Sequence, residues 1–93
     1  MATTKIDGFE VVYSANGFVP RIWLKSGNKI IGQLVFQPDG TTLSAASIAD
    51  SKVSIYYHLE DFPNIIDLLR NQKSMYLAYG GEKFENGIKT TPD

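Results

Sequence analysis

The chain has 93 residues, of which 43% are hydrophobic and 20% are charged, and its net charge is -1. These values are typical of one small globular domain and exclude a disordered or fibrous chain. Cysteine is absent, which excludes disulfides, thiolate zinc sites and thiol catalysis. Neither a basic region followed by an apolar run at the N-terminus nor a stretch of membrane-spanning length is present. We therefore expect a cytoplasmic protein with one globular domain over residues 9–80, a loose lead-in over 1–8 and a flexible tail over 81–93.

Four strands are predicted within residues 9–59, before the predicted helix. Residues 9–15 are rich in β-branched and aromatic side chains and end at Asn16-Gly17, a strong hairpin signal. Alternation of apolar and polar residues predicts three more strands, over 19–25, 29–37 and 52–59. The segment 39–51 is small and polar without a clear period, so we expect a mobile loop there.

One helix and a last strand complete the predicted order. The helix begins near Asp61, whose side chain can cap free amides, and Pro63 is tolerated in its first turn. Its apolar residues recur at three- and four-residue spacing and form one buried stripe. A strand follows over 74–79, and mostly short connections favour antiparallel neighbours. We therefore predict an α+β fold with a single antiparallel sheet of about five strands packed on one helix, in the order β-β-β-β-α-β.

Glycine spacing in the second hairpin raises the question of a ring-forming RNA-binding protein. Gly27 and Gly32, followed by Leu34, resemble the first half of the Sm-like RNA-ring signature over about a fifth of the chain. The chain departs from that signature, because Asp39 falls one residue late and no second Ile-x-Gly motif follows. We therefore interpret Gly27 as a turn residue with positive φ and Gly32 as a bulge or a close approach within the strand.

Few residues offer catalytic or metal-binding chemistry. His58 is the only histidine, so one chain cannot build a histidine metal cluster or a serine-histidine triad. Glu60 and Asp61 are adjacent acids, but at a helix start they are interpreted as capping residues that interact with the helix dipole. Phosphate-binding and dinucleotide-binding glycine motifs are missing. We therefore expect no enzymatic activity, no cofactor and no metal site.

Strand alternation places basic and aromatic side chains together on the outer face of the sheet, away from the helix. Of the ten acidic residues only Glu10 lies within a predicted strand, whereas four of the nine Lys and Arg residues do. The expected interaction face consists of Arg21, Trp23, Lys25, Lys29, Ile31, Gln33, Val35, Lys52, Tyr56, His58 and Tyr76.

Two functions are consistent with this expected face. A homo-oligomer, with a dimer favoured, would remove its apolar residues from water, because large exposed apolar patches mark contacts. Alternatively, its aromatic rings could stack on the bases of single-stranded DNA or RNA while Lys and Arg follow the phosphates. The pI of about 5.7 disfavours this alternative. We therefore expect a non-enzymatic homo-oligomeric interaction module with no membrane partner, and keep nucleic-acid binding as the alternative.

Overall fold

The structure is a computed structural model that describes residues 2–81 and 85–92. Residues 1, 82–84 and 93, which belong to the expected lead-in and tail, lie outside the described residues. The described strands are β1 (Ala2–Ile6), β2 (Gly8–Val12), β3 (Arg21–Ser26), β4 (Lys29–Gln37), β5 (Ser47–Ala49), β6 (Lys52–His58), β7 (Met75–Tyr79) and β8 (Gly87–Lys89). The described helices are a 3₁₀ turn, η1 (Leu59–Asp61), and α1 (Phe62–Asn71).

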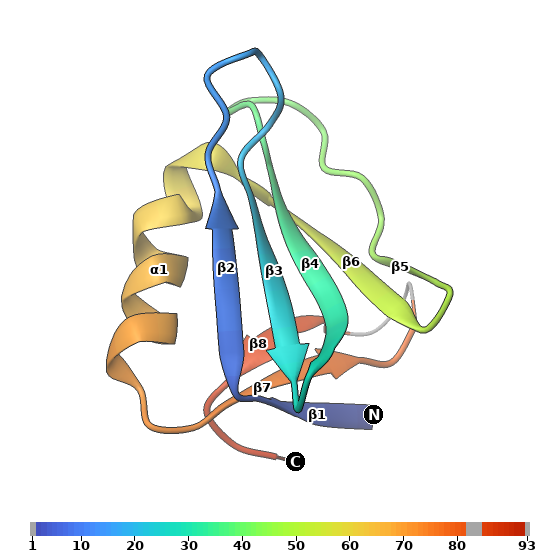
Figure 1. Cartoon of the computed structure of the whole chain (residues 1–93). Helices are drawn as coiled ribbons and strands as arrows, with labels where there is room; N and C mark the ends of the chain where they lie inside the picture. The colour runs from blue at the N-terminus through green and yellow to red at the C-terminus, as the bar shows by residue number, and fades with distance from the viewer. Residues whose placement is uncertain (1, 82–84, 93) are drawn as a thin grey trace.

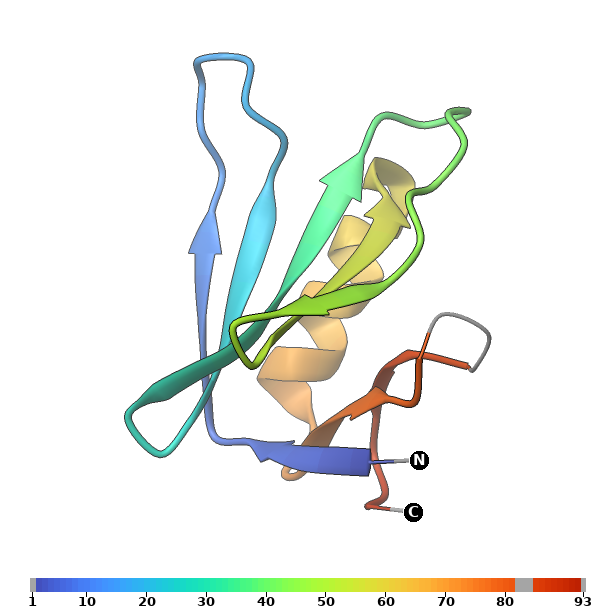
Figure 2. The same ribbon diagram turned by 90° about the vertical axis from the view of Figure 1, so that its right-hand side faces the viewer.

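The strands form two sheets, so the single sheet that we expected is wrong, while the α+β class is confirmed (Figure 1). The larger sheet has the order β2-β3-β4-β6-β5, and the smaller has the order β1-β7-β8. β4 and β6 run parallel, and every other described pair is antiparallel. The parallel pair arises because the chain leaves β4, runs past β6 to β5, and only then turns into β6 (Figure 2).

The segment that we expected to be a mobile loop contains β5. A two-residue turn, Asp50-Ser51, joins β5 to β6, and both residues have positive φ, at 52° and 64°. Such left-handed pairs match the twist of a two-stranded hairpin. Ala49 and Lys52 face each other across the turn. The hairpin was missed because neither Asp50 nor Ser51 is a glycine.

Side chains at the ends of β4 and β6 hold the rest of that segment. The Nε2 of Gln37 donates to the Oγ of Ser44 at 3.0 Å, and the Ser44 amide donates to the Oε1 of Gln37 at 3.1 Å. His58, the register partner of Gln37, has its Nε2 2.6 Å from the carbonyl oxygen of Thr41. The segment after β4 is therefore tied to the sheet by polar contacts.

β1 and β8 form where we expected a loose lead-in and a flexible tail. They lie on either side of β7, with Ile6 opposite Met75 and Ile88 opposite Leu77. Ile6 is buried in the core. Since β1 and β7 are about seventy residues apart, their pairing leaves no local turn signal in the sequence.

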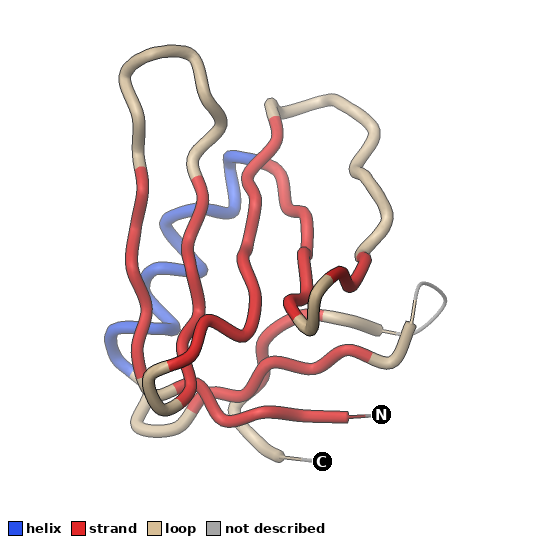
Figure 3. Tube along the Cα trace, turned by 45° about the vertical axis from the view of Figure 1, so that its right-hand side comes forward, coloured by secondary structure: helices blue, strands red, loops and turns tan. Residues whose placement is uncertain are grey.

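α1 lies against the inner face of the larger sheet, and the smaller sheet closes one end of the same core (Figures 1 and 3). Phe36, Ile22, Leu24 and Leu34 are the largest fully buried side chains. The helix adds Ile65 and Leu69 to the core, and the smaller sheet adds Ile6, Met75 and Leu77. No helix among the described residues is long and apolar enough to cross a membrane.

The start of the helix differs from the expected cap. Asp61 precedes α1 but makes no capping hydrogen bond through its side chain. The carboxylate of Asp39 binds a free amide of the helical region instead, because its Oδ1 accepts a hydrogen bond of 2.7 Å from the amide of Glu60 in η1. The turn after β4 and the start of the helical region are thereby linked.

Candidate functional site

The outer face of the larger sheet is the side opposite α1, and no described helix or strand lies over it (Figure 3). Its side chains form rows because paired residues lie side by side across neighbouring strands. The first row is Glu10, Trp23, Gln33 and Ser54. The second row is Val12, Arg21, Val35 and Tyr56.

Polar contacts organise this face around Trp23, which is half-buried. The Nε2 of Gln33 donates to the Oγ of Ser54 at 3.1 Å. The Nζ of Lys25 lies 3.6 Å from the Oε2 of Glu10, and both side chains are well exposed to water. Exposed ion pairs of this kind contribute little to stability. Glu10 is nevertheless the register partner of Trp23, so this part of the face carries a negative charge.

Several of the expected residues do come together here. Arg21, Trp23, Gln33, Val35 and Tyr56 occupy adjacent positions in the two rows. Val35 is buried among them, at 9% exposure. We call these five residues the Trp23 patch. It is an uncovered surface of mixed aromatic, apolar and basic character.

Other expected residues lie at the ends of the sheet. His58 is at one end, where it contacts the segment after β4. Lys29 and Lys52 are at the opposite end, where β4 and β6 begin. Both lysines line a cavity of about 490 Å³ together with Ile30, Ile31, Asp50 and Ser51. His58 and these two lysines therefore lie at opposite ends of the sheet.

Ile31 does not face outward, and a β-bulge explains why. Leu24 pairs with Gly32 but Lys25 pairs with Ile30, so Ile31 is the extra residue. Strict alternation that places Ile31 outward places its neighbour Ile30 inward. In the structure Ile31 packs against the core and Ile30 is 36% exposed. Alternation fails for both residues because a bulge reverses the face to which the side chains beyond it point.

The interpretation of Gly32 as a close approach is confirmed. A Cβ at this position would lie 2.6 Å from the carbonyl oxygen of Val53 and 3.1 Å from the Cδ2 of Leu77. Only a residue without a side chain fits between β6 and the smaller sheet here.

Tyr76 belongs to the smaller sheet, so its expected place on the outer face is wrong. It lies on β7, where its register partners are Lys5 and Lys89. The error follows from assigning β7 to the same sheet as β3 and β4.

Glu10 is a residue of this face that strand parity alone did not place. The pattern of residues 9–15 marked it as the sole acidic residue in a predicted strand. Only the register between β2 and β3 puts it directly beside Trp23. It introduces a negative charge into a face that was expected to be basic.

Tyr57 is a titratable residue whose pKa the fold raises. Burial raises the pKa of its phenol, a backbone hydrogen bond with Ile88 opposes that effect, and the charge of Asp61 adds to it. Its ring stacks on Phe36 with centroids 5.9 Å apart. Tyr57 is therefore a packing residue with a polar tip.

Among residues 2–81 and 85–92, no group of three or more His, Cys, Asp or Glu side chains could hold a metal ion.

Comparison of the chain with protein-family models, curated proteins and solved structures finds no match.

Proposed function

We propose that this protein is a small non-catalytic interaction module that forms a homodimer through the Trp23 patch. The observation that carries the proposal is the position of Trp23, which lies between Glu10 and Gln33 on the second strand of a five-stranded sheet, on a face that no described element covers. Tryptophan is among the residues that contribute most to binding energy when a partner surface excludes water from it.

The charges of the face support a second copy as the partner. Glu10 and Arg21 flank Trp23, one on the neighbouring strand and one on the same strand. In a closed two-fold dimer the same patch meets itself, so each residue of a pair contacts its counterpart reciprocally. A face that carries both signs of charge can satisfy this requirement, whereas a face of one sign would repel its copy.

Sedimentation equilibrium of three variants tests the proposal. Trp23→Ala removes the central ring, and Arg21→Glu places two like charges where opposite charges would meet. We expect both to weaken the dimer by about tenfold or more, because central interface residues commonly contribute about 2 kcal/mol. Phe18→Ala is the matched control, since Phe18 is 67% exposed on the loop between β2 and β3. Equal dissociation of all three variants, or a wild-type monomer, contradicts the proposal.

Single-stranded nucleic-acid binding is the second candidate, and the presence of Arg21 in the same rows as Trp23 and Tyr56 favours it. Glu10 and its ion pair with Lys25 oppose it by neutralising the centre of the face. Binding to phosphates releases counterions, so affinity for labelled poly-dT or poly-U must fall steeply as salt rises. Fluorescence anisotropy at 50 mM salt that detects nothing tighter than about 100 μM removes this candidate.

A further inference from the structure

β2 is an edge strand of the larger sheet. It pairs with β3 on one side, and no described strand pairs with its other side. The inner face of β2, rather than its open edge, is turned toward α1, because Phe9 of β2 lines a cavity together with Leu69 of the helix. The backbone amides and carbonyls of an edge strand form a template on which another extended chain can pair.

A half-exposed apolar strip follows the same edge. Phe9, Val11 and Tyr13 lie on the helix side of β2 and its extension, since Phe9 and Val11 are the register partners of the buried Leu24 and Ile22. Val11 is 42% exposed and Tyr13 is 63% exposed. These are large apolar side chains that the core does not cover.

Apolar side chains of α1 face this strip. Phe62, Ile66 and Leu69 recur at helical spacing and pack on the core. The rings of Tyr13 and Phe62 meet edge to face, with centroids 5.4 Å apart. This contact closes the strip at the end of β2, so an extended chain lying on it would have one defined limit there.

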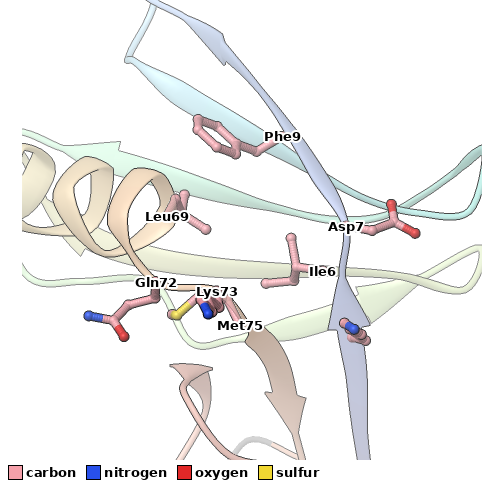
Figure 4. A pocket seen from close by; sticks show the side chains of 8 residues that line it. Ile6, Asp7, Phe9, Leu69, Gln72, Lys73 and Met75 are labelled. Carbon is pink, nitrogen blue, oxygen red and sulfur yellow. The ribbon is translucent and has the colours of Figure 1, made fainter.

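The other limit is a cavity of about 330 Å³ at the start of β2 (Figure 4). Ile6, Phe9, Leu69 and Met75 line it with apolar atoms, and Ile6, Phe9 and Leu69 point toward one another. This volume is at the small end of ligand sites, which span about 300–1,000 Å³. It suits one apolar side chain better than a cofactor.

The charge around the cavity is positive. Lys5 and Lys73 line it, and neither forms an ion pair with a described residue. Asp7 also borders the cavity, but its carboxylate points away and accepts a hydrogen bond of 2.6 Å from the amide of Gly27 (Figure 4). An anionic group at this position would therefore meet two ammonium groups and no opposing carboxylate.

We propose that β2 binds the C-terminal segment of a partner protein as an added antiparallel strand. Its last side chain is apolar and enters the cavity, and its terminal carboxylate lies between Lys5 and Lys73. Because the cavity is at the start of β2, a chain that ends there runs antiparallel to the strand. Every second side chain of the bound peptide before its C-terminal residue then contacts Val11 or Tyr13, as strand addition requires. This site uses the edge of the sheet and leaves the Trp23 patch free, so it is independent of the proposed dimer.

The first test is selection from a library of random heptapeptides displayed with free C-termini. We expect enrichment of sequences whose last residue is apolar. Slowed amide exchange at residues 8–12 in the presence of a selected synthetic peptide would show that the peptide pairs with β2. Failure to enrich any C-terminal sequence, or unchanged exchange across β2, overturns the proposal.

The second test isolates the carboxylate. A fluorescein-labelled peptide from the selection, with a free C-terminus, should bind at least about tenfold more tightly than the same peptide with a C-terminal amide. The double variant Lys5→Glu/Lys73→Glu should lose a similar factor. Arg70→Glu is the matched control, because Arg70 carries the same charge on α1 but does not line the cavity.

Equal affinity of the acid and the amide, or an equal loss in the control, contradicts the proposal. A second copy pairing β2 with β2 is the competing occupant of this edge. It would appear as a dimer whose mass falls with Val11→Lys while no peptide is enriched, and that result would also overturn the proposal.

Discussion

Gly32 lies where β4 is packed closely against both β6 and the smaller sheet. A Cβ there would contact backbone, the carbonyl of Val53, which cannot move aside as a flexible side chain could. We predict that Gly32→Ala lowers the free energy of unfolding by about 1–3 kcal/mol, as overpacking of a core does. Gly8→Ala is the control, since its Cβ would lie an ordinary 3.8 Å from Lys25 and should change stability by less than about 0.5 kcal/mol. Urea unfolding of both variants measures the difference, and equal midpoints would contradict the account.

Tyr57 gives the fold a predicted weakness at alkaline pH. Burial raises its pKa above the ordinary value of about 10, so the folded protein holds this proton more tightly than the unfolded chain does. The free energy of unfolding is therefore undiminished below about pH 10 and falls as the pH rises beyond it. We predict that Tyr57→Phe is less stable at neutral pH, through loss of the bond to Ile88, but loses less stability between pH 9 and 11.

Urea unfolding at a series of pH values measures this effect. Tyr13→Phe is the control, because Tyr13 is 63% exposed and should leave the alkaline loss of stability unchanged. A parallel loss of stability in the wild type and in Tyr57→Phe would show that burial of the phenol is not responsible.

At the scale of elements, we predict that serine-to-glycine substitutions in the hairpin of β5 and β6 change the free energy of unfolding in opposite directions at two positions. Ser51 has φ of 64°, which disfavours any residue with a side chain. Ser51→Gly should therefore raise the free energy of unfolding by about 0.5–1 kcal/mol. Ser47→Gly, in the extended strand β5, should lower it by a similar amount, because glycine loses more backbone freedom there. Two changes of the same sign, measured by urea unfolding, would contradict the turn geometry.

The elements that the sequence predicted are those with a local signal. β4 and α1 have clear periodicity, and the structure places them at Lys29–Gln37 and Phe62–Asn71, close to the expected strand over 29–37 and to the helix start expected near Asp61. β1 gave no signal because it pairs with a strand distant in sequence, and β8 gave none because it has only three residues. The parallel pairing of β4 and β6 depends on where the chain crosses, which no pattern within either strand records.

The candidate site was only partly predictable, for the same physical reason. Parity within β3 separates Arg21 and Trp23 from Ile22 and Leu24, and the structure buries Ile22 and Leu24 in the core. Parity in β4 failed at the bulge, and the sheet of Tyr76 could not be known from its own strand. The cavity between Phe9 and Leu69 needs the packing of β2 against α1, which brings together residues about sixty positions apart.

At the scale of the whole molecule, the two sheets and the helix enclose a core but leave the Trp23 patch facing outward. The helix and the smaller sheet both lie on the inner side, and in the dimer that we propose a second copy would supply the missing layer. We predict that the wild-type protein has twice the 10.3 kDa mass of one chain at micromolar concentrations. Light scattering checks this, and a mass of one chain would contradict it.

Trp23 is the sole tryptophan of the chain, so its fluorescence reports directly on the patch. The most direct test of the account is the emission maximum of Trp23 over a dilution series in which the mass is followed in parallel. If the patch is the dimer interface, the emission shifts to longer wavelength as the dimer dissociates, because the indole becomes exposed to water. An emission maximum that stays constant while the mass falls from two chains to one would place the interface elsewhere and contradict the account.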